Sequence, residues 1–460
     1  MTARRIRVAA PPPPEGFDAI RDELGVPGEF APEALAEADA AARAPRLPAA
    51  DLTAIEFFTI DPPGARDLDQ AMQLERRGSG YRVRYAIADV AAFVAPGGAL
   101  DAETWRRGVT HYAPDRAVPL HPPVLSAGAA SLLPDEVRPA IVWTIDLDAD
   151  AQPVRTEVAR ARVRSRAQLD YAEVQRRAGE FALLAEIGER RQALERERGA
   201  VHLPLPAQEV VCGADGRWDV AYRAPLPVEG HNAQISLLAG LEGARLMVQA
   251  GAGVLRTLPD ADPRALAALR RAAAVLGVAW PAETSYGDFV RSLDPADPAA
   301  AALLQDATAV MRGAAYAAFD GEPPAQRRHA ALAAEYAHVT APLRRLADRY
   351  ALECALAACA GDAPPAWVRE RLEELPAAMA AADRRAGALE RAAIDWVEAV
   401  RLAPRAGEVF RATVVDDGLV QLREPAVRAR CDGDPPVGRA VDVRLVKADP
   451  ATRRVRFATL

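Results

Sequence analysis

The sequence is almost free of lysine. Lys447 is the only lysine among its 57 lysine and arginine residues. A phosphate-binding P-loop needs a lysine directly after a glycine, whereas Lys447 follows Leu445 and Val446 in a strand-like run. P-loop ATPases and GTPases are therefore excluded. Schiff-base and pyridoxal-phosphate enzymes would depend on the same poorly placed lysine, so both are disfavoured.

Cysteine is scarce as well, and no metal motif accompanies it. The sequence has 4 cysteines without a C-x-x-C pair and 6 histidines without an H-E-x-x-H motif, so a zinc site has little support. No segment approaches 18 uninterrupted apolar residues, and the N-terminal residues do not contain the apolar core of a signal peptide. We therefore expect a reduced, cytoplasmic protein that neither enters nor crosses a membrane.

The overall charge gives no sign of a nucleic-acid partner. The 460 residues include 57 basic and 64 acidic side chains, a net charge of -7, and half of the residues are apolar. Such a composition is typical of a globular protein, and the length suggests about two to four domains. Any affinity for nucleic acid must therefore come from local patches.

Two helix-like stretches open the chain. Four prolines at residues 11–14 precede apolar periodicity of helical type at 16–24 and 32–44. A pair of short helices could form a helix-turn-helix. The alternative is a helical lead-in that packs on the next domain.

The body of the chain alternates between strand and helix patterns. Strand-like runs lie at residues 55–60, 81–90 and 141–150, separated by Gly, Pro and Asp turns. Helical spacing dominates residues 165–200 and 231–400. We therefore expect a mixed α and β central domain.

After Pro404 the strand pattern returns. Five short runs, with a hairpin signal at Asp417-Gly418, predict an OB-type barrel. Residues 404–460 contain 11 basic and 8 acidic side chains, a local charge of +3. A basic barrel of this kind is typical of oligonucleotide binding, and a purely structural barrel is the alternative. The runs are EVFRATVV, LVQLRE, AVRARC, AVDVRLVKA and RRVRFATL.

Three aspartates fall within nine residues where a predicted strand ends. If Asp61, Asp67 and Asp69 converge, two charges ~4 Å apart repel by about 4 kcal/mol at an effective dielectric near 20, so a cation or protons must neutralise them. Oxygen ligands favour Mg²⁺ or Mn²⁺ over zinc. The frame of a calcium loop is absent. A solvated turn and a helix N-cap cluster remain as alternatives on spacing alone.

The chain contains, in this order, the segments DLTAIEFFTIDPPGARDLDQAM, YAIADVAAFVAPGGALDAETWRRGVTHYAP, VPLHPPVLSAGAASLLPDEVRPA, EYAHVTAPLRRLADRYALE and GALERAAIDWVEAVRL. Together they resemble the RNB family of exoribonucleases, the ribonuclease II and ribonuclease R type. The resemblance covers residue 48 to the C-terminus, with the motifs in the family's order. It implies an α+β multidomain fold in which a short helical N-terminal segment (1–47) precedes a mixed α/β RNB catalytic domain (48–403) and a C-terminal S1-type OB-fold β-barrel (404–460).

The resemblance also implies site residues. Asp61, Asp67 and Asp69, with Gln70, match the family's metal-dependent phosphodiesterase centre, which implies Mg²⁺ with Mn²⁺ as a substitute. Arg344 resembles the arginine that holds the scissile phosphate, and its planar fork suits phosphate oxygens.

Three further residues are expected to contact RNA. Arg345 could share the phosphate with its neighbour, because residue type alone does not separate adjacent arginines. Tyr112 matches a tyrosine that stacks on the 3′-terminal base, although it could be a core tyrosine. Glu390 stands where the family has a glutamate near the active site, or else forms an ordinary charge pair with Arg391.

The chain departs from the family pattern at several positions. Gln70 stands where the family has a second consecutive aspartate, which removes a charge and a possible base. We consider three explanations: a tolerated variant, a degenerate enzyme and an engineered substitution. Residues 251–255 have no aromatic that could clamp bases. Ala341 and Leu346 replace the signature serine and tyrosine, which we interpret as packing differences.

The implied activity is that of a Mg²⁺-dependent 3′→5′ exoribonuclease, which hydrolyses single-stranded RNA to 5′-mononucleotides in bacterial RNA decay. The ~50 residues before the catalytic block leave no room for the family's two cold-shock domains. We therefore expect structured RNA with a short 3′ overhang to be accepted. The alternatives are an RNA-binding protein silenced by Gln70 and an exonuclease that acts on DNA.

Overall fold

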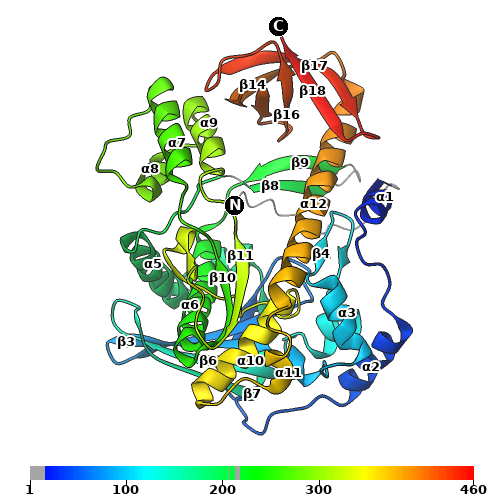
Figure 1. The fold of residues 1–460 in the computed structure, drawn as a ribbon, viewed down its shortest axis with the longest axis vertical. Helices are drawn as coiled ribbons and strands as arrows, with labels where there is room; N and C mark the ends of the chain where they lie inside the picture. Colours follow the sequence, from blue (N-terminus) through cyan, green and yellow to red (C-terminus); the bar gives the residue numbers. More distant parts are fainter. Residues whose placement is uncertain (1–15, 206, 213–217) are drawn as a thin grey trace.

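The structure is a computed structural model that describes residues 16–205, 207–212 and 218–460. The four prolines at 11–14 and the rest of residues 1–15 lie outside the described residues. Two lobes are connected by the long helix α12 (Leu375–Leu402), as Figure 1 shows. One lobe contains the first β-barrel, and the other contains the C-terminal barrel.

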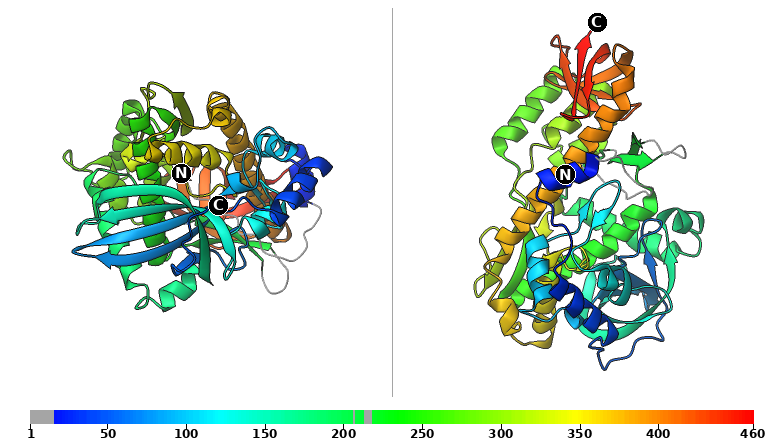
Figure 2. Two further views of the ribbon diagram at one scale, coloured as in Figure 1. Left: turned by 90° about the horizontal axis from the view of Figure 1, so that it is seen from below. Right: turned by 90° about the vertical axis from the view of Figure 1, so that its right-hand side faces the viewer.

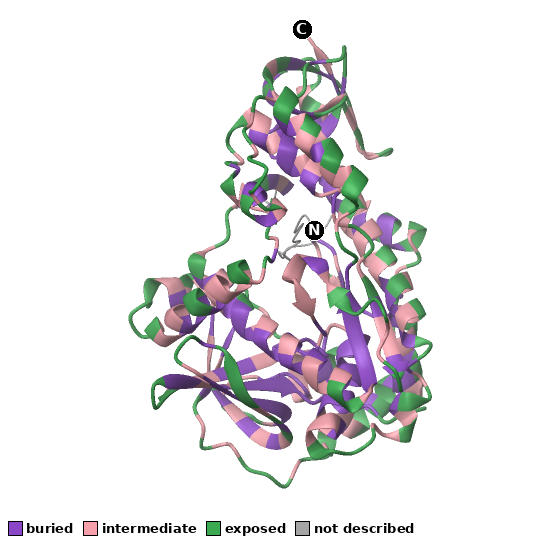
Figure 3. Cartoon of the chain, turned by 60° about the vertical axis from the view of Figure 1, so that its left-hand side comes forward, coloured by how far each residue is buried: buried purple, intermediate pink, exposed green. Residues whose placement is uncertain are grey.

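The first lobe is built on a closed barrel with the strand order β1-β2-β3-β6-β7. Neighbouring strands are antiparallel, except that β1 runs parallel to β7. Tyr85 of β3 pairs with Trp143 of β6, and both side chains are fully buried. Figure 2 shows the barrel from below, and Figure 3 shows buried segments on some of its strands. The strands are β1 (Phe57–Ile60), β2 (Gln70–Arg77), β3 (Gly80–Ala88), β6 (Val137–Leu147) and β7 (Pro153–Leu169).

Three of these strands were predicted from the sequence, and two were missed. The runs at 55–60, 81–90 and 141–150 correspond to β1, β3 and β6, which confirms them. Strand β2 reads QAMQLERR and contains no β-branched or aromatic residue, so its pattern does not indicate a strand. The helical prediction for 165–200 began too early, because β7 continues to Leu169.

Helices α6 (Pro227–Ala250) and α10 (Leu346–Ala360) cover the barrel and share its core. Gly240 of α6 permits a close approach, because a Cβ there would lie 2.1 Å from the ring of Tyr336. The Gly240 carbonyl accepts the N–H of Ala337 at 3.1 Å. The segment that leads to Thr340 is therefore packed tightly on α6.

The region 231–400 is less helical than the sequence suggested. Gly251 ends α6 in the left-handed conformation, at a φ of 76°, and the chain then forms strand β10 (Ala252–Thr257). Strand β11 (Ala315–Asp320) pairs with it, although its sequence AYAAFD is dominated by alanine, which favours a helix. The pairing of these strands overrides the local preference.

The remaining elements surround this body. They are α3 (Ala99–Arg107), β4 (His111–Tyr112), β5 (Ala117–Val118), α4 (Tyr171–Arg176), α5 (Ala182–Glu197), β8 (Ala207–Cys212), β9 (Trp218–Arg223), α7 (Pro263–Val275), α8 (Tyr286–Ser292), α9 (Pro298–Ala307), β12 (Arg328–His329), β13 (Ala334–Glu335) and α11 (Ala366–Arg369), together with the short helical turns Val90–Ala92, Leu125–Ala129, Ala330–Leu332 and Ala403–Arg405.

The C-terminal lobe contains a second closed barrel with the strand order β14-β15-β16-β18-β17, which fits an OB-fold. Each of its five strands coincides with a run that the sequence predicted. Two of its arginines form ion pairs within the barrel, Arg411 with Asp442 at 3.1 Å and Arg456 with Asp432 at 2.7 Å. The strands are β14 (Val409–Asp416), β15 (Leu419–Leu422), β16 (Arg428–Asp432), β17 (Ala440–Asp449) and β18 (Arg454–Thr459).

The N-terminal helices α1 (Gly16–Glu23) and α2 (Pro32–Arg43) belong to different hydrophobic clusters. Phe17 of α1 is fully buried, with its ring 4.7 Å from that of Trp396 of α12. Helix α2 packs on α3 instead. The structure therefore favours the helical lead-in over a helix-turn-helix. Within the described residues, no helix is long and apolar enough to span a membrane.

Candidate active site

The predicted aspartates lie in the turn between β1 and β2. Asp61 directly follows β1, and its backbone N–H donates to Leu169 at 3.0 Å. Asp69 directly precedes β2, and its carbonyl accepts the N–H of Ala88 at 2.9 Å. Gly64, between these two aspartates, adopts a left-handed backbone conformation at a φ of 78°. Both ends of the turn are thus fixed by the barrel.

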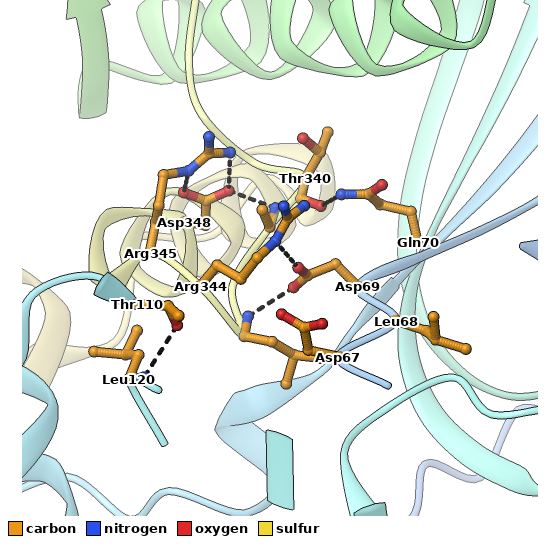
Figure 4. A network of polar contacts seen from close by, with 12 residues as sticks. Asp67, Leu68, Asp69, Gln70, Thr110, Leu120, Thr340, Arg344, Arg345 and Asp348 are labelled. Carbon is orange, nitrogen blue, oxygen red and sulfur yellow. Dashed lines mark hydrogen bonds and ion pairs between the residues drawn. The ribbon is translucent and has the colours of Figure 1, made fainter. Parts of the chain in front are cut away.

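Asp69 connects this turn to the loop that carries Arg344. Its Oδ1 accepts the backbone N–H of Leu343 at 2.7 Å, and its Oδ2 accepts the Nε–H of Arg344 at 2.7 Å (Figure 4). The Asp69 side chain is 1% exposed, whereas that of Arg344 is 38% exposed. Among the described residues, Nε is the only guanidinium nitrogen of Arg344 with a hydrogen bond. Both terminal nitrogens therefore remain available to a phosphate.

Arg345 is placed differently from Arg344. Its Nε and Nη2 donate to the two carboxylate oxygens of the fully buried Asp348, at 2.8 and 2.9 Å. Asp348 also accepts the N–H of Ala341 at 2.6 Å. A bidentate pair occupies the planar fork that would otherwise bind a phosphate. The contacts therefore separate the two neighbouring arginines, which the sequence could not, and favour Arg344 as the phosphate contact.

Tyr112 lies beside the acidic turn. It belongs to β4, and its hydroxyl donates to Oδ2 of Asp67 at 3.1 Å. Burial raises the pKa of the phenol above its usual value, so the hydroxyl stays protonated and remains a donor. The structure thus brings together two residues that the sequence separates by 45 positions.

Two of the aspartates are poorly solvated. Burial raises the pKa of Asp61 to about 6 and that of Asp69 to about 7, although the positive charge of Arg344 opposes both shifts. The Asp61 Oδ2 atom is buried and has no hydrogen-bond partner among the described residues. A buried carboxylate oxygen of this kind is suited to accept a proton or to contact a cation.

The predicted metal set fits this arrangement only in part. Within the described residues, no group of three or more histidine, cysteine, aspartate or glutamate side chains is placed to hold a metal ion. Both oxygens of Asp69 accept protein donors, and the Gln70 amide donates to the carbonyl of Thr340. Asp61 and Asp67, which repel each other electrostatically, are the two carboxylates left to face a cation.

Glu390, the last of the predicted site residues, comes from the long helix. It lies half-buried on α12, the helix that packs against the strand carrying Tyr112. Its role as an RNA contact stays a prediction.

A hydrogen-bonded pair of aromatic side chains was not predicted from the sequence. Residues 251–255 hold no aromatic, but the neighbouring strand β11 supplies Tyr316 opposite Arg256. Tyr316 shares a hydrogen bond of 2.7 Å with Nδ1 of His338. His338 lies two residues before Thr340, so the motif around Arg344 was a signal that could have pointed to it.

Comparison with known proteins supports the fold. The model of the RNB domain matches residues 49–357, and that of the RNase II-type exonuclease C-terminal S1 domain matches residues 408–460. The chain belongs to the RNB family. Ribonuclease R of Escherichia coli is 27% identical over 398 residues, which cover 79% of this chain and 48% of that protein. The chain spans about half the length of the curated relatives it matches.

Solved structures show the same fold. Mycoplasma genitalium RNase R in complex with ribose-methylated single-stranded RNA aligns with a TM-score of 0.85 at 17% identity, covering 96% of this chain and 77% of that one. The complex of the same RNase R with double-stranded RNA gives a TM-score of 0.84 at 18% identity, and the alignment covers 96% of this chain and 82% of that chain. Yeast Ssd1, described as a pseudonuclease, aligns with a TM-score of 0.70 at 15% identity, and the alignment covers 95% of this chain and 57% of Ssd1.

Proposed function

We propose that this RNB-family chain is a 3′→5′ exoribonuclease that hydrolyses single-stranded RNA to 5′-mononucleotides. The observation that carries the proposal is the guanidinium of Arg344, which is anchored through Nε to Asp69 and is 38% exposed. The anchored group lies within electrostatic range of Asp61 and Asp67. A fixed cation beside carboxylates suits the charge that develops on a phosphodiester during hydrolysis.

Each side chain has a distinct role in this proposal. The terminal nitrogens of Arg344 hold the scissile phosphate and stabilise its developing charge. Tyr112 stacks on the terminal base, which gives affinity without sequence preference, while its hydroxyl orients Asp67. Asp61 can take a proton from the attacking water, because its buried Oδ2 accepts no hydrogen bond from the described residues.

A divalent cation, Mg²⁺ or Mn²⁺, is part of the proposal. Bound beside Asp61 and Asp67, it would neutralise their repulsion and polarise a phosphate oxygen. The buried Oδ2 of Asp61 supports this part of the proposal, because it has no hydrogen-bond partner in the part of the chain that the structure describes.

The second candidate is an RNA-binding protein without catalysis. Gln70 removes a carboxylate from the motif, and the structural neighbour Ssd1 is described as a pseudonuclease. Arg344 and Tyr112 would still hold RNA in such a protein.

A time course with a 5′-labelled single-stranded RNA oligomer tests these alternatives. We expect metal-dependent shortening to a small 5′-labelled remnant in Mg²⁺ or Mn²⁺ and intact RNA in EDTA. Intact RNA in every lane, together with measurable binding, would instead support the non-catalytic candidate. A matched DNA oligomer is the control for sugar specificity, because the 2′-OH distinguishes the two polymers.

Structured RNA is proposed as a further substrate. One structural neighbour is an RNase R in complex with double-stranded RNA. We expect duplexes with a short single-stranded 3′ overhang to be degraded, and a series of overhang lengths tests this. The cytoplasmic location and the bacterial RNA-decay role stay predictions.

A further inference from the structure

Gln70 is the first residue of β2 and immediately follows Asp69. Its Nε2 donates a hydrogen bond to the backbone carbonyl of Thr340 (Figure 4). A carbonyl oxygen only accepts, so the amide must present its nitrogen to Thr340. The Gln70 side chain therefore supports the loop, and its NH₂ group is the part in use.

Asp69 holds the same loop through two other bonds. Its carboxylate accepts the N–H of Leu343 and the Nε–H of Arg344, both at 2.7 Å. Two consecutive residues at the start of β2 thus fasten the segment from Thr340 to Arg344. Gln70 holds the beginning of this segment, and Asp69 holds its end.

The opposite side of the loop is held by backbone and helix contacts. The carbonyl of Arg344 accepts the N–H of Thr110 at 2.9 Å, and Asp348 of α10 accepts the N–H of Ala341. These contacts fix the path of the chain but do not hold the carbonyl of Thr340, a residue that is 5% exposed. A buried carbonyl that loses its donor favours a shift of the backbone around it.

We propose that Gln70 is a positioning residue, which clamps the Thr340 carbonyl and thereby holds the guanidinium of Arg344 beside the aspartates. This inference rests on the proposed role of Arg344 in phosphate binding. It assigns Gln70 to the loop and not to a cation. An aspartate at this position would bring a shorter, acceptor-only side chain against the Thr340 carbonyl, so restoring the family's residue should loosen the site.

Four single variants test the clamp. Gln70→Glu keeps the shape of the side chain but loses the donor, Gln70→Ala removes the group, and Gln70→Asp restores the family residue. Gln73→Ala is the matched control, because Gln73 is half-buried on the same strand and contacts Arg84 instead.

We expect all three changes at Gln70 to lower kcat on RNA by about 10- to 100-fold and to raise KM, since small misplacements of a catalytic group cost rates of this order and Arg344 is also proposed to bind the phosphate. The control should keep wild-type kcat. An increase in kcat for Gln70→Asp would overturn the proposal, because it would show that a carboxylate at this position serves catalysis. Wild-type kcat in Gln70→Glu would do the same, because it would show that the donor is dispensable.

A double-mutant cycle separates this inference from the proposed function. The affinity for a short RNA oligomer is measured in EDTA for Gln70→Ala, Arg344→Ala and the double variant. If Gln70 acts through Arg344, Gln70→Ala weakens RNA binding when Arg344 is present but has no effect in the Arg344→Ala background. If this binding pattern is found in a protein that does not hydrolyse RNA, the proposed function is refuted and the clamp is supported. Additive effects would overturn the clamp whether or not the protein is active.

Discussion

The raised pKa of Asp61 predicts that this residue destabilises the folded protein at neutral pH. Its pKa rises from 3.8 to about 6, and each unit corresponds to about 1.4 kcal/mol. The folded state therefore binds this proton more tightly than the unfolded chain. The penalty is nearly absent below about pH 4, grows as the pH rises toward 6, and then stays constant at about 2 to 3 kcal/mol.

Asp61→Asn removes this penalty because the amide is neutral at every pH. We expect the variant to be more stable than the wild type by about 2 to 3 kcal/mol at pH 7.5 and nearly equal to it at pH 4. Urea unfolding in EDTA at several pH values, followed by circular dichroism, measures the difference. The same variant should lose RNA hydrolysis, since Asp61 is proposed to accept a proton.

Asp51→Asn is a control of opposite sign. The side-chain hydrogen bond from Thr53 lowers the pKa of Asp51. The charged carboxylate therefore stabilises the fold at pH values above the pKa that Asp51 has in the unfolded chain. We expect Asp51→Asn to be less stable than the wild type at pH 7.5. A variant at Asp61 that is less stable than the wild type at pH 7.5 would refute the reasoning. So would a stability difference that does not depend on pH.

Other substitutions test the remaining contacts. Arg344→Lys should lower kcat by about 10²- to 10³-fold, because a lysine does not reproduce the fork geometry of the guanidinium. Arg345→Lys should lower kcat less, and single-turnover hydrolysis compares the two variants. Tyr112→Ala should weaken RNA binding by about 1 to 3 kcal/mol in fluorescence anisotropy, while Tyr112→Phe keeps the stacking ring and most of the affinity. Phe17→Ala should destabilise the packing of α1 on α12 by about 3 to 5 kcal/mol, and an unchanged thermal midpoint would contradict that packing.

The C-terminal barrel could be predicted from the sequence because its strands alternate clearly and turn residues separate them. In the catalytic domain, β2 and β11 were missed, since their residues do not favour strands and only pairing in the fold forms them. The roles of Asp69 and Arg344 came from the family resemblance. Their contact joins residues 275 positions apart, which no local pattern reveals.

The pairing of Asp69 with Arg344 also determines how variants at this site must be interpreted. Asp69 is 1% exposed and has a pKa of about 7, so its charge near neutral pH depends on the guanidinium beside it. Removing Arg344 would leave a buried carboxylate that takes up a proton, and removing Asp69 would release the arginine from its anchor. Loss of activity in Arg344→Ala would thus combine a lost phosphate contact with a changed Asp69. Arg344→Lys retains the positive charge, and so its effect on kcat reports more directly on the geometry of the phosphate contact.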